Sequence, residues 1–282
     1  MRVTTHQFST VLHEPTAAQI IDILNLKLST ETDRQNQFFA AVCHETEGVT
    51  DPQDWTFEAR NLVLAQYIAT YNTDGNPNFV IGGKYSYSQY LLDTSDQPPQ
   101  YLSKHEVGGV SLGMQPLTGR MIGVLELNCH NRIDWVIGVL AAMSRFEDDP
   151  VTEDTSQSGQ RIMARVEWIK GLTANEFGKL LQVWGNARFE LTRYFHWDIQ
   201  DLGLVILPNP KEVGLPPTRF CAVDALPATV IYALGQSDVW RDLVIAQDQE
   251  WAASDFGDAF ERDTASHSPS TPEADQMTME GA

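Results

Sequence analysis

Two adjacent Cys-His pairs, Cys43-His44 and Cys129-His130, are the residue types in this chain best suited to chemistry. Thiolate and imidazole groups bind zinc, and a thiol beside an imidazole can act as a nucleophile. Neighbouring helix residues point about 100° apart, so each pair offers only one good metal ligand. The zinc spacings CxxC, HxxxH and HExxH do not occur. We interpret both cysteines as buried thiols, with a Cys/His site assembled by the fold as the alternative.

Nucleotide-binding patterns are missing from the chain. A P-loop needs GxxxxGK followed by serine or threonine, whereas Gly83-Lys84 precedes Tyr85 and has Asn78 at the place of the first glycine. The Gly82-Gly83 pair between FVI and KYSY instead predicts a two-residue hairpin turn. We also expect no nucleophile elbow of the serine hydrolases.

Paired carboxylates and one histidine complete the candidates for catalysis. Asp148-Asp149 and Asp51-Asp54 are expected in loops, and a chain with 38 Asp and Glu residues contains such pairs by chance. His196 lies in an aromatic run, which favours packing in a core or an interface over ligand stacking. We therefore predict no catalytic, cofactor-binding or metal-binding residue, and we do not expect an enzyme.

The net charge of −19 argues against general binding of nucleic acid or of anionic membranes, because both need basic residues. It fits an acidic surface that meets a basic partner, or an acidic decoy of a nucleic-acid-binding protein. The odd number of cysteines, three, indicates reduced thiols. No run of 18 apolar residues and no apolar signal segment is found, so we expect neither a membrane span nor secretion.

Residues 171–200 form the longest strongly amphipathic stretch, and we expect it to organise the chain. Thr173 and Glu176 form a capping box that predicts a helix start. Apolar residues then recur at helical spacing, namely Phe177, Leu180, Leu181, Trp184, Leu191 and Tyr194 or Phe195. Gly178 and Gly185 lie seven residues apart and could let a neighbouring helix approach closely. We predict that this stretch is the spine of a second domain.

The predicted fold is mainly α-helical (an α+β chain), with a small β-hairpin insertion and two helical domains. The N-terminal domain covers residues 1–146, with the hairpin near 79–90. An acidic linker, 147–160, separates it from a C-terminal domain over 161–251, and a disordered acidic tail covers 252–282. In the helix expected over 55–71, Glu58 and Arg60 are expected to lie on the outside.

Several segments resemble proteins of tailed bacteriophages, notably tail-assembly chaperones and baseplate assembly factors. They are LTANEFGKLLQVWGNARFELTRYF, DALPATVIYALGQSDVWRDL, DWTFEARNLVLAQYIATY and QPLTGRMIGVLELN. The likeness covers about half of the chain and rests on the pattern of hydrophobic residues, so no functional residue is carried over. It implies a non-enzymatic protein of the virion or host cytoplasm that binds other phage structural proteins, or a second copy of itself, during tail or baseplate assembly.

Exposed aromatic residues are the expected contacts with a partner, because tryptophan and tyrosine are enriched at binding hot spots. The candidates are Trp184, Tyr194, Trp197, Trp240, Phe256 and Phe260. The two phenylalanines lie four residues apart, as anchors of a helix that forms on binding would. The alternatives are an enzyme of unknown chemistry with a Cys/His site and the acidic decoy.

Overall fold

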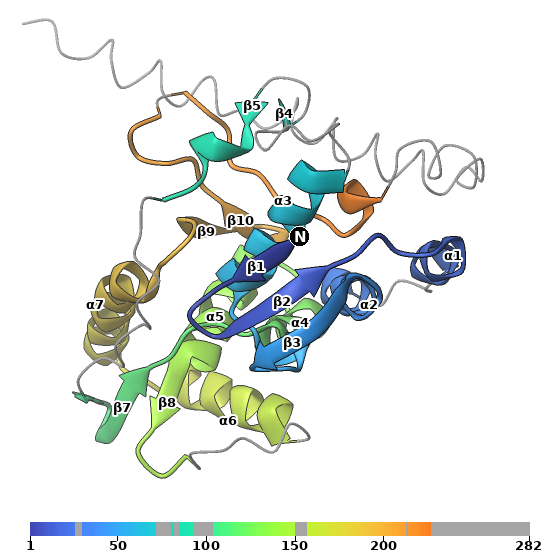
Figure 1. The fold of residues 1–282 in the computed structure, drawn as a ribbon. Helices are drawn as coiled ribbons and strands as arrows, with labels where there is room; N and C mark the ends of the chain where they lie inside the picture. Colours follow the sequence, from blue (N-terminus) through green and yellow to red (C-terminus); the bar gives the residue numbers. More distant parts are fainter. Residues whose placement is uncertain are drawn as a thin grey trace, which may run out of the picture. The chain divides into compact units, whose positions relative to one another are not determined.

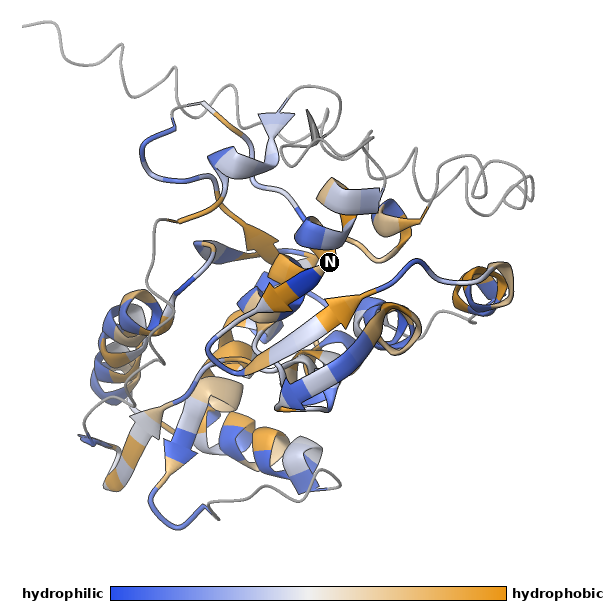
Figure 2. Cartoon of the chain, viewed as in Figure 1, coloured by the Kyte–Doolittle hydropathy of each residue, from blue (hydrophilic) through white to orange (hydrophobic). Residues whose placement is uncertain are grey.

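Alternating burial along residues 8–12 explains why the chain begins with a sheet. Every second side chain of β2 (Phe8–Leu12) is buried, as the two-residue period of a strand requires. β2 pairs antiparallel with β1 (Arg2–Thr4) and β3 (Cys43–Gly48), which gives the strand order β1-β2-β3. Figure 2 shows β3 as a hydrophilic edge strand, and exposed charges on an edge disfavour pairing with other chains.

The structure is a computed structural model that describes residues 1–25, 30–71, 80–81, 85–92, 104–149, 157–212 and 214–226 (Figure 1). Its α-helices are α1 (Ala17–Asn25), α2 (Glu31–Val42), α3 (Phe57–Tyr71), α4 (Gly119–Asn128), α5 (Arg132–Met143), α6 (Ser158–Lys170) and α7 (Ala174–Leu191). The short 3-10 helices are η1 (Pro52–Asp54), η2 (Tyr87–Gln89) and η4 (Val223–Ala225). Met1–Pro227 forms one compact unit.

Three further antiparallel sheets lie along the described chain. They are β4 (Val80–Ile81) with β5 (Tyr85–Ser86), β6 (His105–Val107) with β7 (Val110–Met114) and β8 (Ser144–Phe146), and β9 (Trp197–Gln200) with β10 (Gly203–Ile206). The β6–β7 turn is Gly108-Gly109, with φ of 56° and 75°. Positive φ at both positions is the geometry of a tight hairpin turn that glycine adopts without strain.

The prediction of a mainly α-helical chain with two helical domains is wrong. The fold is mixed, with small antiparallel sheets beside the helices. Two segments explain much of the difference. Cys43-His44 was expected at the end of a helix but begins β3, and residues 197–200 were expected in the helix over 171–200 but form β9. In β9 the buried Trp197 and Ile199 alternate with half-exposed residues, which is the period of a strand.

The hydrophobic core joins elements from both sides of the predicted linker. Ile162 and Ile169 of α6 and Leu180 of α7 belong to the same buried cluster as Leu140 of α5. α5 lies at its centre: residues 138–143 are all buried, and the helix packs against α4, α6, α7 and β9 (Figure 1). A helix that is apolar on most faces is expected in such a position.

The predicted hairpin near 79–90 is present as the β4–β5 pair, and its turn, 82–84, lies outside the described residues. Half of the predicted linker (150–156) and the whole predicted tail (252–282) also lie outside them, so both stay predictions. Within the described residues, no helix is long and apolar enough to cross a membrane.

α7 starts at the predicted capping box, but it is not the spine of a domain. Thr173 and Glu176 form both bonds of the box. Leu180, Ala187 and Leu191 are the buried residues of the helix, which ends at Leu191. At Gly178 and Gly185 an added Cβ would meet no atom within 4 Å, so no described helix uses the space that these glycines leave.

Two neighbouring leucines of α7 allow a direct test of this placement. Leu180 is fully buried and Leu181 only partly. We expect Leu180→Ala to lower the free energy of unfolding by about 3 kcal/mol, since a buried leucine leaves a cavity, and Leu181→Ala by about 1 kcal/mol. Urea unfolding of both variants measures the difference. Equal losses of unfolding free energy in the two variants would mean that the buried face of α7 is not the one that contains Leu180.

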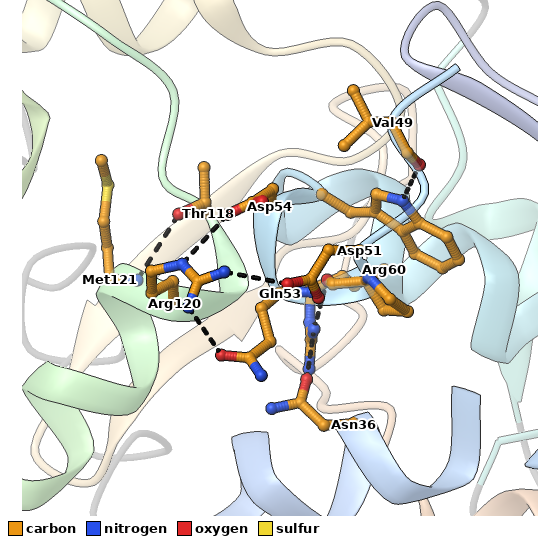
Figure 3. A network of polar contacts seen from close by, with 11 residues as sticks. Asn36, Val49, Asp51, Gln53, Asp54, Arg60, Thr118, Arg120 and Met121 are labelled. Carbon is orange, nitrogen blue, oxygen red and sulfur yellow. Dashed lines mark hydrogen bonds and ion pairs between the residues drawn. The ribbon is translucent and has the colours of Figure 1, made fainter. Parts of the chain in front are cut away.

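Glu58 and Arg60 in the first turn of α3 are buried, with 6% and 1% exposure, although both were expected outside. The Arg60 guanidinium donates to carbonyl oxygens of Pro52 in η1 (2.7 Å) and Thr32 in α2 (3.3 Å). Figure 3 shows the guanidinium between these elements. The prediction failed because α3 is buried on nearly all faces, so helical period does not mark an outer side.

Candidate functional site

The cysteines belong to three different parts of the fold, and each is half-buried. Burial raises the pKa of the Cys43 thiol to about 12. Burial and the nearby Asp134 charge raise the pKa of Cys129 to about 11, and burial raises that of Cys221 well above its usual value. The thiolate is the nucleophile and the metal ligand, so these environments disfavour both roles.

The two Cys-His pairs contact different residues. The His44 ring lies beside His13, with 4.6 Å between ring centroids. The Cys129 thiol donates to the Asp134 carbonyl oxygen at 3.4 Å. In the part of the chain that the structure describes, no group of three or more His, Cys, Asp or Glu side chains could hold a metal ion.

From the raised pKa values of the thiols we predict slow alkylation in the folded protein. In the folded protein at pH 8, all three thiols should react with iodoacetamide at least about tenfold more slowly than in the urea-unfolded chain, because little thiolate is present. Mass spectrometry of the alkylated peptides gives each rate separately. If one cysteine reacted faster in the folded state, the result would support the alternative of an enzyme with a Cys/His site.

One segment matches the GxSxG pattern of a nucleophile elbow, although we expected no such pattern in the chain. Gly109–Gly113 reads GVSLG and therefore matches GxSxG. A working elbow needs its serine at a sharp turn from strand to helix. Ser111 instead lies within β7 and pairs with Glu106 of β6, so its surroundings are those of a strand residue in a sheet.

The carboxylate pairs form ion pairs that hold structure together. Asp51 and Asp54 both bind the Arg120 guanidinium, each at 3.0 Å, at the start of α4 (Figure 3). Asp149 binds the buried Arg165 of α6 at 2.5 Å. None of these contacts joins two carboxylates in a geometry for acid–base catalysis.

Three of the predicted partner-binding aromatics fall within the described residues. Tyr194 and Trp197 are buried, with 7% and 5% exposure. Trp184 is partly buried, and its indole N–H contacts the Met143 sulfur at 3.2 Å. The other three, Trp240, Phe256 and Phe260, lie outside the described residues.

Arg188 of α7 brings the aromatics of this region together. Its guanidinium carbon lies 5.3 Å from the Trp184 ring centroid, 5.2 Å from that of Trp197 and 6.0 Å from that of Phe189. Its NH1 group donates to Asp198 Oδ1 of β9 at 3.0 Å. We call the following residues the Arg188 cluster: Trp184, Arg188, Phe189, His196, Trp197 and Asp198. Contacts of a cation with ring faces add about 0.5–2 kcal/mol each, so the cluster is well fixed.

Phe189 is the exposed member of the Arg188 cluster. Its side chain is 66% exposed, and its ring meets the His196 ring edge-to-face at 6.2 Å. Burial, helped by the Arg188 charge, lowers the pKa of His196, so its imidazole is neutral at pH 7. The exposed aromatic of the cluster is therefore Phe189, since Trp197 is buried and Trp184 is partly buried.

The sequence-based list missed Phe189, although a signal was present. Phe189 is out of phase with Leu180, Ala187 and Leu191, the residues that α7 buries. A large aromatic on the polar side of an amphipathic helix is such a signal. Further exposed apolar side chains, each more than half exposed, are Leu127, Ile133 and Leu202.

Neither geometry nor sequence ties the Arg188 cluster to a known family. Comparisons with models of protein families, with curated proteins and with solved structures find no match.

Proposed function

We propose that this protein acts through protein–protein contacts, as a structural or assembly protein of a tailed bacteriophage. It would be a component of the tail or baseplate, or a chaperone of tail assembly. The observation that carries the contact role is Phe189, a large aromatic that is 66% exposed and whose ring contacts His196 and Arg188. Binding hot spots combine such a rigid apolar anchor with a polar rim.

The chemistry of the Arg188 cluster supports contact over catalysis. The positive charge of Arg188 is already paired with Asp198 and stacked on aromatic rings. His196 is the titratable side chain beside Phe189, and the cluster contains no serine, cysteine or lysine that it could activate. A surface of this kind offers shape and apolar area to a partner.

The assignment to phage assembly rests on sequence resemblance. The segment 172–195, which resembles phage tail-assembly proteins, contains the whole of α7 and therefore Phe189. The resembling segment 54–71 contains α3. The likeness and the candidate surface thus fall on the same helix, and partners would be other phage structural proteins.

Mass spectrometry of purified phage particles, together with affinity purification of the tagged chain from infected cells, tests the assignment. We expect the chain in the particles, or a tail or baseplate protein bound to the tagged chain. Absence from particles combined with no co-purifying tail or baseplate protein would reject the assembly role. Recovery of a basic host DNA-binding protein alone would favour the acidic decoy instead.

A further inference from the structure

A β-bulge between β2 and β3 decides which way the side chain of His44 points (Figure 1). Ser9 of β2 pairs with Glu47 of β3. Two residues further along β2, Val11 pairs with His44, which is three residues away from Glu47. In a regular ladder His44 would instead face the buried Leu12. The extra residue therefore turns the His44 imidazole from the core side of the sheet to its outer side.

The backbone of Glu45 gives the bulge its shape. Its φ of 48° lies in the left-handed region, which glycine usually occupies in bulges of this type. The Thr10 hydroxyl holds the bulge, since it donates to the His44 carbonyl oxygen at 3.1 Å and lies 2.8 Å from the Thr46 hydroxyl. Strained backbone of this kind is found often at binding sites, so the surroundings of His44 are a candidate for one.

His13 lies beside His44 on the outer side of the sheet. Its N–H donates to the Val42 carbonyl oxygen at 2.8 Å, which keeps the end of β2 next to β3. The two ring centroids are 4.6 Å apart, and the ring planes are inclined by 53°. Both side chains are exposed, and within the described residues neither imidazole takes part in a hydrogen bond. Their nitrogen atoms are therefore open to a ligand from solution.

The separation of the rings fits two imidazoles on one metal ion. With Zn–N bonds of about 2.0–2.1 Å and angles of about 90–110° at the metal, the centres of two ligand rings lie about 4.5–5.2 Å apart. The 4.6 Å between His13 and His44 is within this range, and the rings are tilted rather than stacked. Turning a ring about χ2 leaves its centre in place, so one nitrogen of each ring can face the same point.

The charges near the two histidines favour a cation. Glu14 follows His13 and Glu45 follows His44, and all four side chains are exposed. Arg2 of β1 pairs its guanidinium with the Glu45 carboxylate at 3.5 Å, so its positive charge is offset. The net charge of −19 adds to the attraction of cations to the surface.

We propose that His13 and His44 bind a divalent transition-metal ion that prefers imidazole nitrogen, with Zn²⁺ as the reference ion. Of the Cys43-His44 pair only the histidine is a ligand, because neighbouring strand residues point to opposite faces and Cys43 pairs with the buried Leu12. The described residues form no group of three or more metal-binding side chains. Water, or a donor atom of another molecule, therefore fills the remaining positions on the ion.

Calorimetric titration of the full chain with zinc chloride, in a buffer that does not chelate metals, tests this site. The tightest binding event of the wild type should have a stoichiometry of about one ion per chain. His13→Gln and His44→Gln should each weaken this event by at least about tenfold, because each removes a direct ligand. Both positions are exposed, so both variants should fold. The double variant should lose little more than either single variant, because the two rings hold one ion together.

His130→Gln is the matched control. His130 is the histidine of the second Cys-His pair and is also exposed, but it lies between α4 and α5. This variant should bind Zn²⁺ as tightly as the wild type. Wild-type affinity in His13→Gln or in His44→Gln would overturn the proposal. Equal weakening in all three single variants would also overturn it, since it would show adventitious binding to scattered histidines only.

A second measurement needs no variant to fold. In NMR spectra of the wild type, the imidazole signals of His13 and His44 should shift together until about one equivalent of Zn²⁺ has been added, while those of His130 stay in place. Signals of His13 and His44 that do not change would contradict the proposal. Neither histidine belongs to the Arg188 cluster, so this result leaves the partner-binding role untouched and the two proposals fail separately.

Discussion

Replacing Arg60 with leucine should lower the free energy of unfolding by about 4 kcal/mol. The guanidinium is 1% exposed, and its donors reach Gln35, Asn36, Thr32 and Pro52. Leucine removes the guanidinium donors from these oxygen atoms, and it also removes the contact of the guanidinium with the Phe39 ring at 4.9 Å. Urea or thermal unfolding measures the loss.

The arginine of the same network that pairs with exposed acids is the control. Arg120 binds Asp51 and Asp54, whose side chains are 47% and 46% exposed. Pairs of this exposure add little, so Arg120→Leu should lower the free energy of unfolding by about 1 kcal/mol. A loss below about 1 kcal/mol for Arg60→Leu would show that water replaces its partners and that the guanidinium does not tie α2, η1 and α3 together.

Asp149→Ala should lower the free energy of unfolding by about 3 kcal/mol. Its carboxylate binds Arg165, whose side chain is 3% exposed, and it accepts the Phe146 N–H at 2.6 Å. Removing it takes a close negative partner away from a buried positive charge. Arg165 also donates to the Ala141 carbonyl oxygen at 3.4 Å and lies against the Phe146 ring.

Asp148 is the matched control, because this neighbouring aspartate is exposed. Asp148→Ala should change the free energy of unfolding by no more than about 0.5 kcal/mol. Chemical denaturation of both variants gives the comparison. Similar small effects would mean that the start of the predicted linker is not fastened to α6.

Local capping residues mark where helices start. Thr173 and Glu176 start α7 as the capping box predicts, and Thr30 caps α2. A short break after Asn128 separates α4 from α5, and the Asn131 side chain accepts the N–H groups of Ile133 and Asp134 at the start of α5. Each of these features depends on residues within one turn of each other, so the sequence contains the whole interaction.

Tertiary partners explain what could not be predicted. Glu58 and Arg60 look like exposed residues of an amphipathic helix, and their partners at residues 193, 194 and 32 are distant in sequence. Residues 197–200 become a strand by pairing with β10 rather than by local preference. Trp184 and Trp197 of the Arg188 cluster were among the predicted partner contacts and Phe189 was not, because which aromatic is exposed depends on the face that α7 buries.

Affinity purification of the tagged wild-type chain, Phe189→Ser and Ile133→Ser from infected cells tests the contact role most directly. Phe189 and Ile133 are similarly exposed, at 66% and 71%, but only Phe189 belongs to the Arg188 cluster. We predict that the wild type and Ile133→Ser recover the same tail or baseplate protein and that Phe189→Ser, while folded, loses it. Equal recovery of that protein by Phe189→Ser and the wild type would contradict the role of this surface.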